Sequence, residues 1–136
     1  MSSFRFRKKT DYGLIMVSLL AQRGRDQVMS VREMQEMGLP RSFLVKIAKS
    51  LVDAGIVGAK EGRGGGYYLK GKPERVTLKK LVEVLEGKVA TTACVAHGMK
   101  CPMADKCPHR LVMKRLSDEL EGVLDRYTIS DLSKGK

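Results

Sequence analysis

Residues 41–69 read RSFLVKIAKSLVDAGIVGAKEGRGGGYYL, and this stretch decides the fold. Its first half repeats apolar residues at the spacing of an amphipathic helix, so a helix is predicted at residues 41–54. Its second half has two strand-like runs, at residues 56–60 and 67–70, joined by the segment EGRGGG. These runs predict a hairpin with a glycine-rich tip. A groove-reading helix followed directly by such a hairpin is typical of a winged helix-turn-helix domain.

Two helices are predicted upstream of this stretch. Ser30 and Glu33 have the spacing of a capping box, which begins a helix at residues 31–37 that Gly38 ends. Two short helices joined by a tight turn form a helix-turn-helix candidate. Residues 8–22 predict a further helix that is apolar nearly all round, so we expect it at the centre of the core.

Two helices are also predicted downstream. Thr77 caps a helix that buries Leu78, Leu81, Val82 and Leu85. A long helix follows at residues 110–127, and its apolar residues recur at spacings of three and four, which predicts a dimer contact. They are Met113, Leu116, Leu120, Val123 and Tyr127. The expected fold is therefore mainly α with a small β-hairpin: a winged helix-turn-helix domain at residues 1–75, then a cysteine-containing loop and dimerisation helices at residues 76–136.

The charge balance indicates a polyanionic partner. The chain has 26 Lys and Arg against 15 Asp and Glu, a formal net charge of +11, which favours double-stranded DNA. A membrane partner is disfavoured because the apolar run after the basic N-terminus is shorter than the roughly 20 residues that span a bilayer. Polar residues follow that run at once, and no signal-peptide cleavage site is recognisable. We therefore expect a cytoplasmic protein.

Basic and hydroxyl side chains on the outer face of the helix at 41–54 suit a DNA groove. The same pattern would fit an ordinary solvated helix face, but the neighbouring hairpin favours DNA. Contacts to base edges are expected from Arg41 and Ser42, contacts to phosphates from Lys46, Lys49, Arg5 and Arg7, and insertion into a minor groove from Arg63.

All three cysteines, Cys94, Cys101 and Cys107, lie in one loop that glycine and proline residues punctuate. Three thiols make a poor disulfide framework because one is always left over. Thiolates instead select zinc, copper(I) or iron–sulfur clusters, so the loop predicts a metal site that needs a fourth ligand. A structural zinc site usually has cysteine pairs about two to four residues apart, and C-x6-C-x5-C lacks such a pair.

An enzyme that uses Cys107 with His109 is the third interpretation of this loop. The two residues are too close in sequence to act as separate nucleophile and base, and no oxyanion or cofactor motif accompanies them. We therefore expect no catalytic residues and no small-molecule substrate.

Several stretches together resemble the Rrf2 family of bacterial winged-helix regulators, in particular its cluster-binding NsrR-like and IscR-like branch. The resemblance covers essentially the whole chain, and its most specific parts are the GRGGGY hairpin tip and the cysteine triplet. The stretches are RKKTDYGLIMVSLLA, FLVKIAKSLVDAGIV, GRGGGYYL, VTLKKLVEVLEG, the cysteine loop and RYTISDL.

The resemblance implies a homodimeric DNA-binding transcriptional regulator. Its operator binding would be controlled by an iron–sulfur cluster on Cys94, Cys101 and Cys107, with 4Fe-4S as the first expectation before 2Fe-2S. Such a cluster would sense nitric oxide, redox or iron–sulfur status. The alternative is a cluster-free thiol-redox or zinc-containing winged-helix repressor. The signal, the operator, and the choice between repression and activation stay open.

The identity of the fourth ligand divides the family. NsrR-like members use an Asp near the N-terminus of the partner subunit, and Asp11, within TDYGL, matches that position. IscR-like members use a His soon after the third cysteine, and His109 lies somewhat nearer to Cys107 than that type shows. Asp11 is our first choice and His109 the alternative. Val45 stands where the IscR type has glutamate, so the target discrimination of that type does not carry over.

Overall fold

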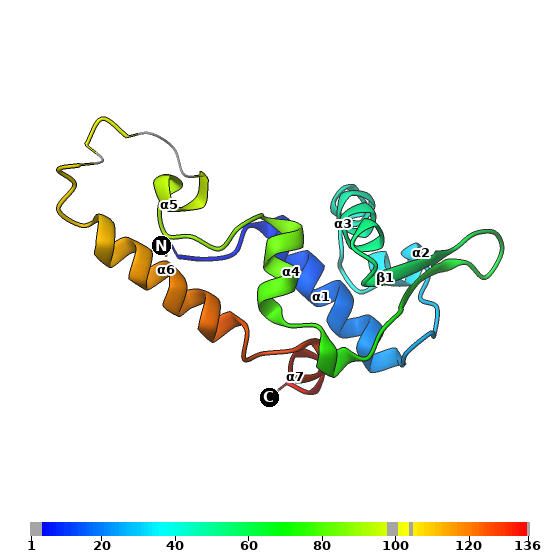
Figure 1. Cartoon of the computed structure of the whole chain (residues 1–136). Helices are drawn as coiled ribbons and strands as arrows, with labels where there is room; N and C mark the ends of the chain where they lie inside the picture. The colour runs from blue at the N-terminus through cyan, green and yellow to red at the C-terminus, as the bar shows by residue number, and fades with distance from the viewer. Residues whose placement is uncertain (1–3, 98–100, 104, 136) are drawn as a thin grey trace.

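The computed structural model describes residues 4–97, 101–103 and 105–135 of the chain, which are mainly helical with one small hairpin (Figure 1). The elements in chain order are α1 (Lys8–Arg23), α2 (Val31–Glu36), α3 (Arg41–Asp53), β1 (Val57–Lys60), β2 (Gly66–Leu69), the 3-10 turn η1 (Pro73–Arg75), α4 (Leu78–Leu85), α5 (Ala93–His97), α6 (Arg110–Leu124) and α7 (Ile129–Lys134). The expected fold class, mainly α with a small hairpin, is confirmed.

Helix α1 lies at the centre of the core, as its sequence predicts. Met16, Val17 and Leu20 are fully buried, and α3, α4 and α7 pack around them. Helix α3 buries Leu44, Ile47, Ala48 and Leu51, and α4 buries Leu78, Leu81, Val82 and Leu85. These are the apolar positions that the helical periodicity identifies.

The capping box at the start of α2 is present. The backbone N–H of Glu33 donates to Ser30 Oγ over 3.1 Å, and the N–H of Ser30 donates to Glu33 Oε1 over 3.4 Å. Helix α3 is held at its N-terminal end by Phe43, whose ring centroid lies 5.0 Å from that of Tyr12 on α1. These contacts fix the helix-turn-helix on the core.

The hairpin pairs β1 with β2 in antiparallel register, from Val57 opposite Leu69 to Lys60 opposite Gly66. A third segment joins its other edge through a bridge between Met29 and Tyr67. At Gly66, φ is +152°, and a Cβ there would lie 2.2 Å from the carbonyl oxygen of Met29. Glycine is therefore required where the hairpin crosses the segment before α2.

The C-terminal part differs from the sequence prediction in three places, the first of which is α5, a short helix within the predicted cysteine loop. Helix α6 ends at Leu124 because the next residues bridge to the start of α4: Leu78 N donates to the carbonyl of Tyr127 over 2.7 Å, and Ile129 N to that of Val76 over 3.0 Å. Helix α7 was not predicted, although Thr128 and Asp131 form a capping box at its start. Its Ile129 is buried against the core. The core therefore includes residues from both expected parts of the chain, residues 1–75 and 76–136.

Along the described residues, no helix combines the length and the apolar character needed to cross a bilayer.

Candidate functional site

The outer face of α3 is exposed and mainly polar, with Val45 as an exposed apolar residue on it. Arg41, Ser42, Lys46 and Lys49 all lie on it, opposite the buried stripe of the same helix. Lys49 Nζ lies 3.4 Å from Asp53 Oδ2, but both side chains are more than half exposed. Because such surface pairs contribute little free energy, Lys49 remains available to a polyanion at small cost.

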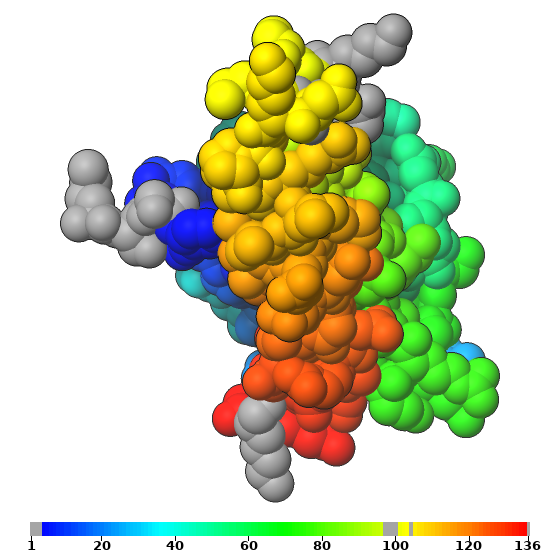
Figure 2. Space-filling view, turned by 60° about the vertical axis from the view of Figure 1, so that its left-hand side comes forward, coloured from blue at the N-terminus to red at the C-terminus, as the bar shows by residue number. Residues whose placement is uncertain are grey.

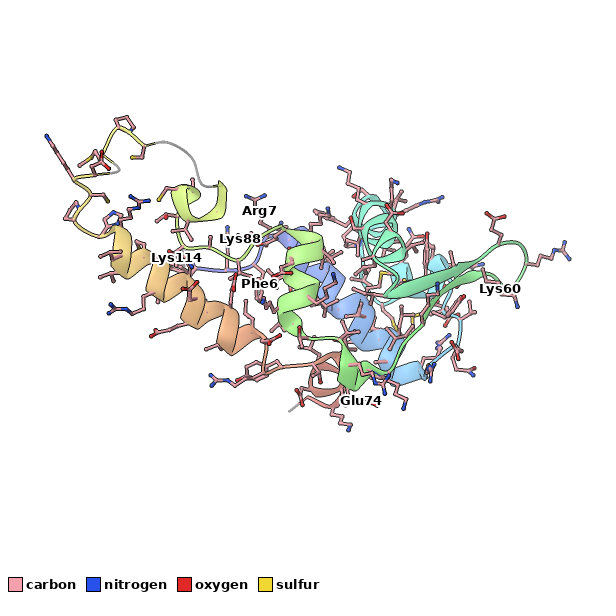
Figure 3. All side chains as sticks on the ribbon, in the orientation of Figure 1. Phe6, Arg7, Lys60, Glu74, Lys88 and Lys114 are labelled. Atoms are coloured by element: carbon pink, nitrogen blue, oxygen red, sulfur yellow. The ribbon has the colours of Figure 1, made fainter. Side chains whose placement is uncertain are left out.

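The hairpin tip carries Arg63 at an exposed position between two glycines of positive φ, Gly62 and Gly64. The backbone is narrow here, since a Cβ on the next glycine, Gly65, would lie 2.2 Å from the carbonyl oxygen of Lys60. Figure 3 shows basic side chains spread along the molecule, from Lys114 on α6 to Lys60 on the hairpin. The tip thus presents one guanidinium on a thin loop, which suits a minor groove.

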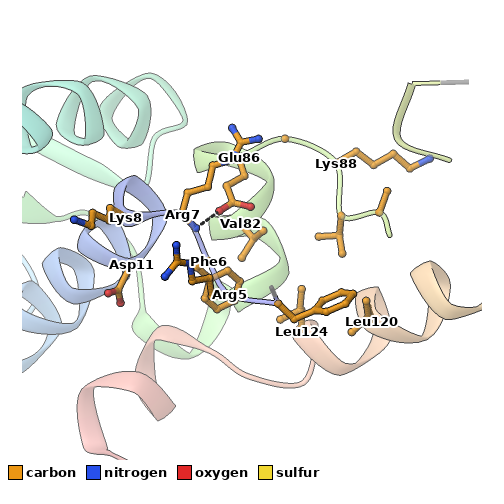
Figure 4. Close-up of a pocket in the computed structure, with 14 residues that line it drawn as sticks. Arg5, Phe6, Arg7, Lys8, Asp11, Val82, Glu86, Lys88, Leu120 and Leu124 are labelled. Atoms are coloured by element: carbon orange, nitrogen blue, oxygen red, sulfur yellow. Dashed lines mark hydrogen bonds between the residues drawn. The ribbon is translucent and has the colours of Figure 1, made fainter. Parts of the chain in front are cut away.

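Arg5 and Arg7 lie before the start of α1. They line an open groove together with Asp11, the end of α4, the segment after it, and Leu120 and Leu124 of α6 (Figure 4). The backbone N–H of Arg7 donates to Glu86 Oε1 over 2.9 Å. No residue that lines this groove comes from α3 or the hairpin. The phosphate contacts of Arg5 and Arg7 therefore stay a prediction.

The three cysteines are free thiols in different settings. Cys94 lies half-buried on α5, with its Sγ 3.1 Å from Thr92 Oγ1. Cys101 is exposed, and the half-buried Cys107 has its Sγ 3.8 Å from His109 Nδ1. Within the described residues, no three His, Cys, Asp or Glu side chains are close enough to hold a metal ion.

The donor set nevertheless fits a thiolate-ligated metal or cluster. The thiols are unpaired, and the His109 imidazole already contacts Cys107. Soft sulfur donors of this kind suit iron–sulfur clusters and zinc. Asp11 lies in the groove beside the start of α1, on a different element from the cysteines. Ligation by all three cysteines would require Cys94, Cys101 and Cys107 to lie closer to one another than they do here.

Helix α6 leaves an apolar stripe uncovered. Figure 2 shows α6 along one face of the molecule, with the N-terminal segment at its side and the cysteine loop at its end. Leu116, Val123 and Tyr127 of the predicted dimer seam are exposed, whereas Met113 and Leu120 are half-buried against their own chain. Leu111 and Val112, which the sequence prediction did not include, extend the exposed stripe with relative exposures of 79% and 54%.

Thr91 and Ser117 are further residues near the loop that the sequence did not single out. Ser117 is 1% exposed, and its hydroxyl bonds to Thr91, three residues before Cys94. A serine within a helix and a threonine in a linker carry no recognisable signal, because only the fold brings them together.

The chain matches known proteins along nearly all of its length. Residues 6–135 match the model of the Rrf2 family, described as an iron-dependent transcriptional regulator. The repressor NsrR of Streptomyces coelicolor is 32% identical over 130 residues, which cover 94% of this chain and 87% of that protein.

Two solved structures have the same fold. CymR, the global cysteine regulator of B. subtilis, superposes with a TM-score of 0.79 at 27% identity, covering 98% of each chain. IscR from T. potens superposes with a TM-score of 0.77 at 26% identity, covering 98% of this chain and 88% of that one.

Proposed function

The chain belongs to the Rrf2 family of transcriptional regulators, and on that premise we propose that it is a homodimer whose operator binding is controlled by an iron–sulfur cluster. The observation that carries the proposal is the position of three free thiols in a loop that leads directly into α6, the helix with the uncovered apolar stripe. The loop that would hold the cluster and the stripe that would contact the partner subunit would then be joined at α6.

The DNA-binding surface is proposed to be the outer face of α3 together with the hairpin tip. Arg41 and Ser42, at the N-terminal end of α3, would approach base edges in a major groove, and Lys46 and Lys49 would contact the flanking phosphates. Arg63 would enter the adjacent minor groove. A net charge of +11 supports this assignment, because it draws the chain towards a polyanion.

The dimer contact is proposed to form along α6. Leu111, Val112, Leu116, Val123 and Tyr127 remain exposed, and apolar side chains that recur along one helix favour a helix-to-helix contact. A two-fold dimer would present two copies of α3 at a fixed separation, which half-sites in DNA can select.

The cluster is proposed to be held by Cys94, Cys101 and Cys107, with 4Fe-4S as the first expectation. Asp11 of the partner subunit is the proposed fourth ligand, and His109 is the alternative. A weaker oxygen or nitrogen ligand beside three thiolates leaves one iron open to nitric oxide, to oxygen or to loss. Ligation by Asp11 across the dimer would link the cluster to the separation of the two α3 helices, since Asp11 lies on α1, against which α3 packs.

Operator affinity of the cluster-loaded and cluster-free forms, measured at one salt concentration, tests the proposal. Protein purified without oxygen should absorb visible light and release acid-labile sulfide, and the two forms should differ in affinity. If the purified protein is colourless and free of sulfide, and the variant with all three cysteines changed to serine binds its operator normally, the cluster has no role.

A cluster-free thiol regulator is the second candidate. The contact between Cys107 Sγ and His109 Nδ1 and the similarity to CymR favour it. In that case metal-free protein would bind DNA in its reduced form and respond to oxidants. A zinc-containing repressor would instead hold one zinc ion per chain, which elemental analysis detects.

A further inference from the structure

The residues Thr91, Ser117 and the carbonyl group of Met113 form a hydrogen-bonded unit, here called the Thr91–Ser117 clasp. The backbone N–H of Thr91 donates to Ser117 Oγ over 2.9 Å, and Thr91 Oγ1 donates to the Met113 carbonyl over 3.0 Å. The two hydroxyl oxygens lie 2.9 Å apart. Because the Thr91 hydroxyl hydrogen already goes to Met113, Ser117 is the donor in this bond. One residue is thus tied to α6 at two points about one turn apart.

The clasp replaces a bond that Ser117 would otherwise make within its own helix. A serine inside a helix commonly donates to the carbonyl four residues earlier, which for Ser117 is that of Met113. Here the Thr91 hydroxyl takes that carbonyl, and among the described residues the hydroxyl of Ser117 bonds to Thr91 instead. Ser117 is 1% exposed, so loss of its hydroxyl would leave the Thr91 N–H without a partner beside a buried position.

The clasp stands directly before the first cysteine. Helix α5 begins two residues after Thr91; the carbonyl of Thr92 accepts from Ala96 N over 3.0 Å, and Thr92 Oγ1 lies 3.1 Å from Cys94 Sγ. Cys94 is therefore held on a helical turn that the clasp attaches to α6. Cys101 and Cys107 lie outside helices and strands. Of the three thiols, Cys94 is the one that lies on a helix.

We propose that the Thr91–Ser117 clasp is a positioning device that fixes Cys94 against α6, so that Cys94 is the anchored ligand of the cluster. The inference rests on the proposed function for the identity of the ligand. Thr91 and Ser117 are positioning residues, since they act through Cys94. The clasp also joins Cys94 to the helix proposed as the dimer contact, so a change at Cys94 would reach the subunit interface through hydrogen bonds.

Thiol reactivity in the cluster-free protein tests the anchoring without any metal. Each cysteine can be followed by itself, because cleavage after Lys88, Lys100, Lys106 and Arg110 places Cys94, Cys101 and Cys107 on separate peptides. The probe is iodoacetamide, a neutral thiol reagent, and alkylation of each peptide is measured by mass spectrometry over time.

Ser117→Ala and Thr91→Val should each speed alkylation of Cys94 by roughly two- to tenfold, the range expected for loss of one or two partly buried hydrogen bonds. Cys101 and Cys107 should keep their rates. Thr91→Ser retains the hydroxyl and should restore the wild-type rate. Ser18→Ala is the matched control, because Ser18 Oγ donates to the carbonyl of Leu14 within α1, far in sequence from the loop. This variant should leave the alkylation rates of all three cysteines unchanged.

Two results would overturn the inference: an unchanged Cys94 rate in both clasp variants, or an equal increase at all three cysteines. The same variants, loaded with cluster without oxygen and exposed to a chelator, should lose visible absorbance faster than wild type and Ser18→Ala. If wild-type protein takes up no cluster, the proposed function fails, and the alkylation rates still decide whether the clasp anchors Cys94.

Discussion

Arg23, the last residue of α1, forms an ion pair with Glu33 in the first turn of α2, with 2.5 Å between Nη2 and Oε2. Glu33 also completes the capping box with Ser30, so one carboxylate both caps α2 and ties it to the central helix. Arg23 makes a second bond, to the carbonyl of Val28, over 3.2 Å. The first helix of the helix-turn-helix is therefore held by a charge pair at its N-terminus, where the helix dipole also favours a carboxylate.

This pair predicts a pH-dependent contribution to stability. The hydrogen bond from Arg23 holds the pKa of Glu33 below its ordinary value, and the hydrogen bonds from Ser30 act in the same direction. A lowered pKa means that the contribution is present above the pKa of an unfolded glutamate, about 4.3, and is lost as the pH falls through the lower folded value. Glu33→Gln keeps a capping side chain but removes the charge.

The melting temperature of Glu33→Gln should accordingly lie below that of wild type at pH 7, and the difference should shrink as the pH falls below about 4.3. Glu36→Gln is the control, since its pair with Arg32 is far more exposed, and it should have little effect at either pH. A Glu33→Gln deficit that stayed the same at pH 3 would show that the charge is not its cause.

Gly66→Ala should lower the free energy of unfolding by about 2 kcal/mol or more, because its φ of +152° disfavours any side chain and the new Cβ would meet the Met29 carbonyl. Gly71→Ala, with open space around it and no positive φ, should stay within about 0.5 kcal/mol of wild type. Urea unfolding at pH 7 measures both. Equal stability of the two variants would mean that the hairpin does not need the bridge between Met29 and Tyr67.

Thr10→Val should stabilise the protein by about 1 kcal/mol. The Thr10 side chain is fully buried on α1, and its Oγ1 is the buried side-chain polar atom without a hydrogen-bond partner in the described part of the chain. Thr77→Val makes the same chemical change at the cap of α4, where Oγ1 accepts from Lys80 N, and should destabilise by about 1 kcal/mol. Thermal unfolding compares the two. A destabilising Thr10→Val would indicate a hydrogen-bond partner for the hydroxyl in solution.

Lys49→Ala should weaken operator binding about equally for all sequences and lower the slope of log affinity against log salt by about one. Its side chain is exposed on α3, and its ion pair with Asp53 is a surface pair. Lys134→Ala removes the same charge from α7 and should leave the slope unchanged. Fluorescence anisotropy across a salt series gives both slopes. If the two variants behave alike, α3 is not the helix that contacts DNA.

Mixed dimers should decide whether Asp11 ligates across the subunit contact. One subunit carries Asp11→Ala with its cysteines intact, and the other carries Asp11 with all three cysteines changed to serine. Ligation across the dimer gives one complete site in this heterodimer, and ligation within a subunit gives none. We expect cluster loading of the heterodimer at about half the wild-type level, measured by acid-labile sulfide. If His109 is the ligand, the Asp11→Ala homodimer keeps its cluster and the His109→Ala homodimer loses it.

The sequence identified the local elements well, because their signals lie within a few residues of each other. Helical periodicity picked out the buried faces of α3 and α4, and the Ser30–Glu33 spacing marked the start of α2. Hairpin and helix limits agree to within a residue or two where a glycine or a cap sets them. The short helix α5 has no such signal, and the capping box before α7 was overlooked.

The candidate site was predicted only in part. Residue types alone assigned the three cysteines to a metal or cluster site and α3 to a DNA groove, because thiolate and guanidinium chemistry does not depend on the fold. Only the structure placed Arg5 and Arg7 in the groove beside α4 and α6, which no residue of α3 lines. It also showed that two of the five residues of the predicted α6 seam, Met113 and Leu120, are half-buried against their own chain.

The sequence by itself therefore determined the kind of protein: a basic, mainly helical chain with a glycine-tipped hairpin and a three-thiol loop. The tertiary structure alone decided which surfaces stay uncovered and which distant residues meet, such as Thr91 with Ser117 and Tyr127 with Leu78. The reason is physical. Helix and turn signals act over three or four residues, whereas these hydrogen bonds join residues tens of positions apart and depend on how every helix packs on α1.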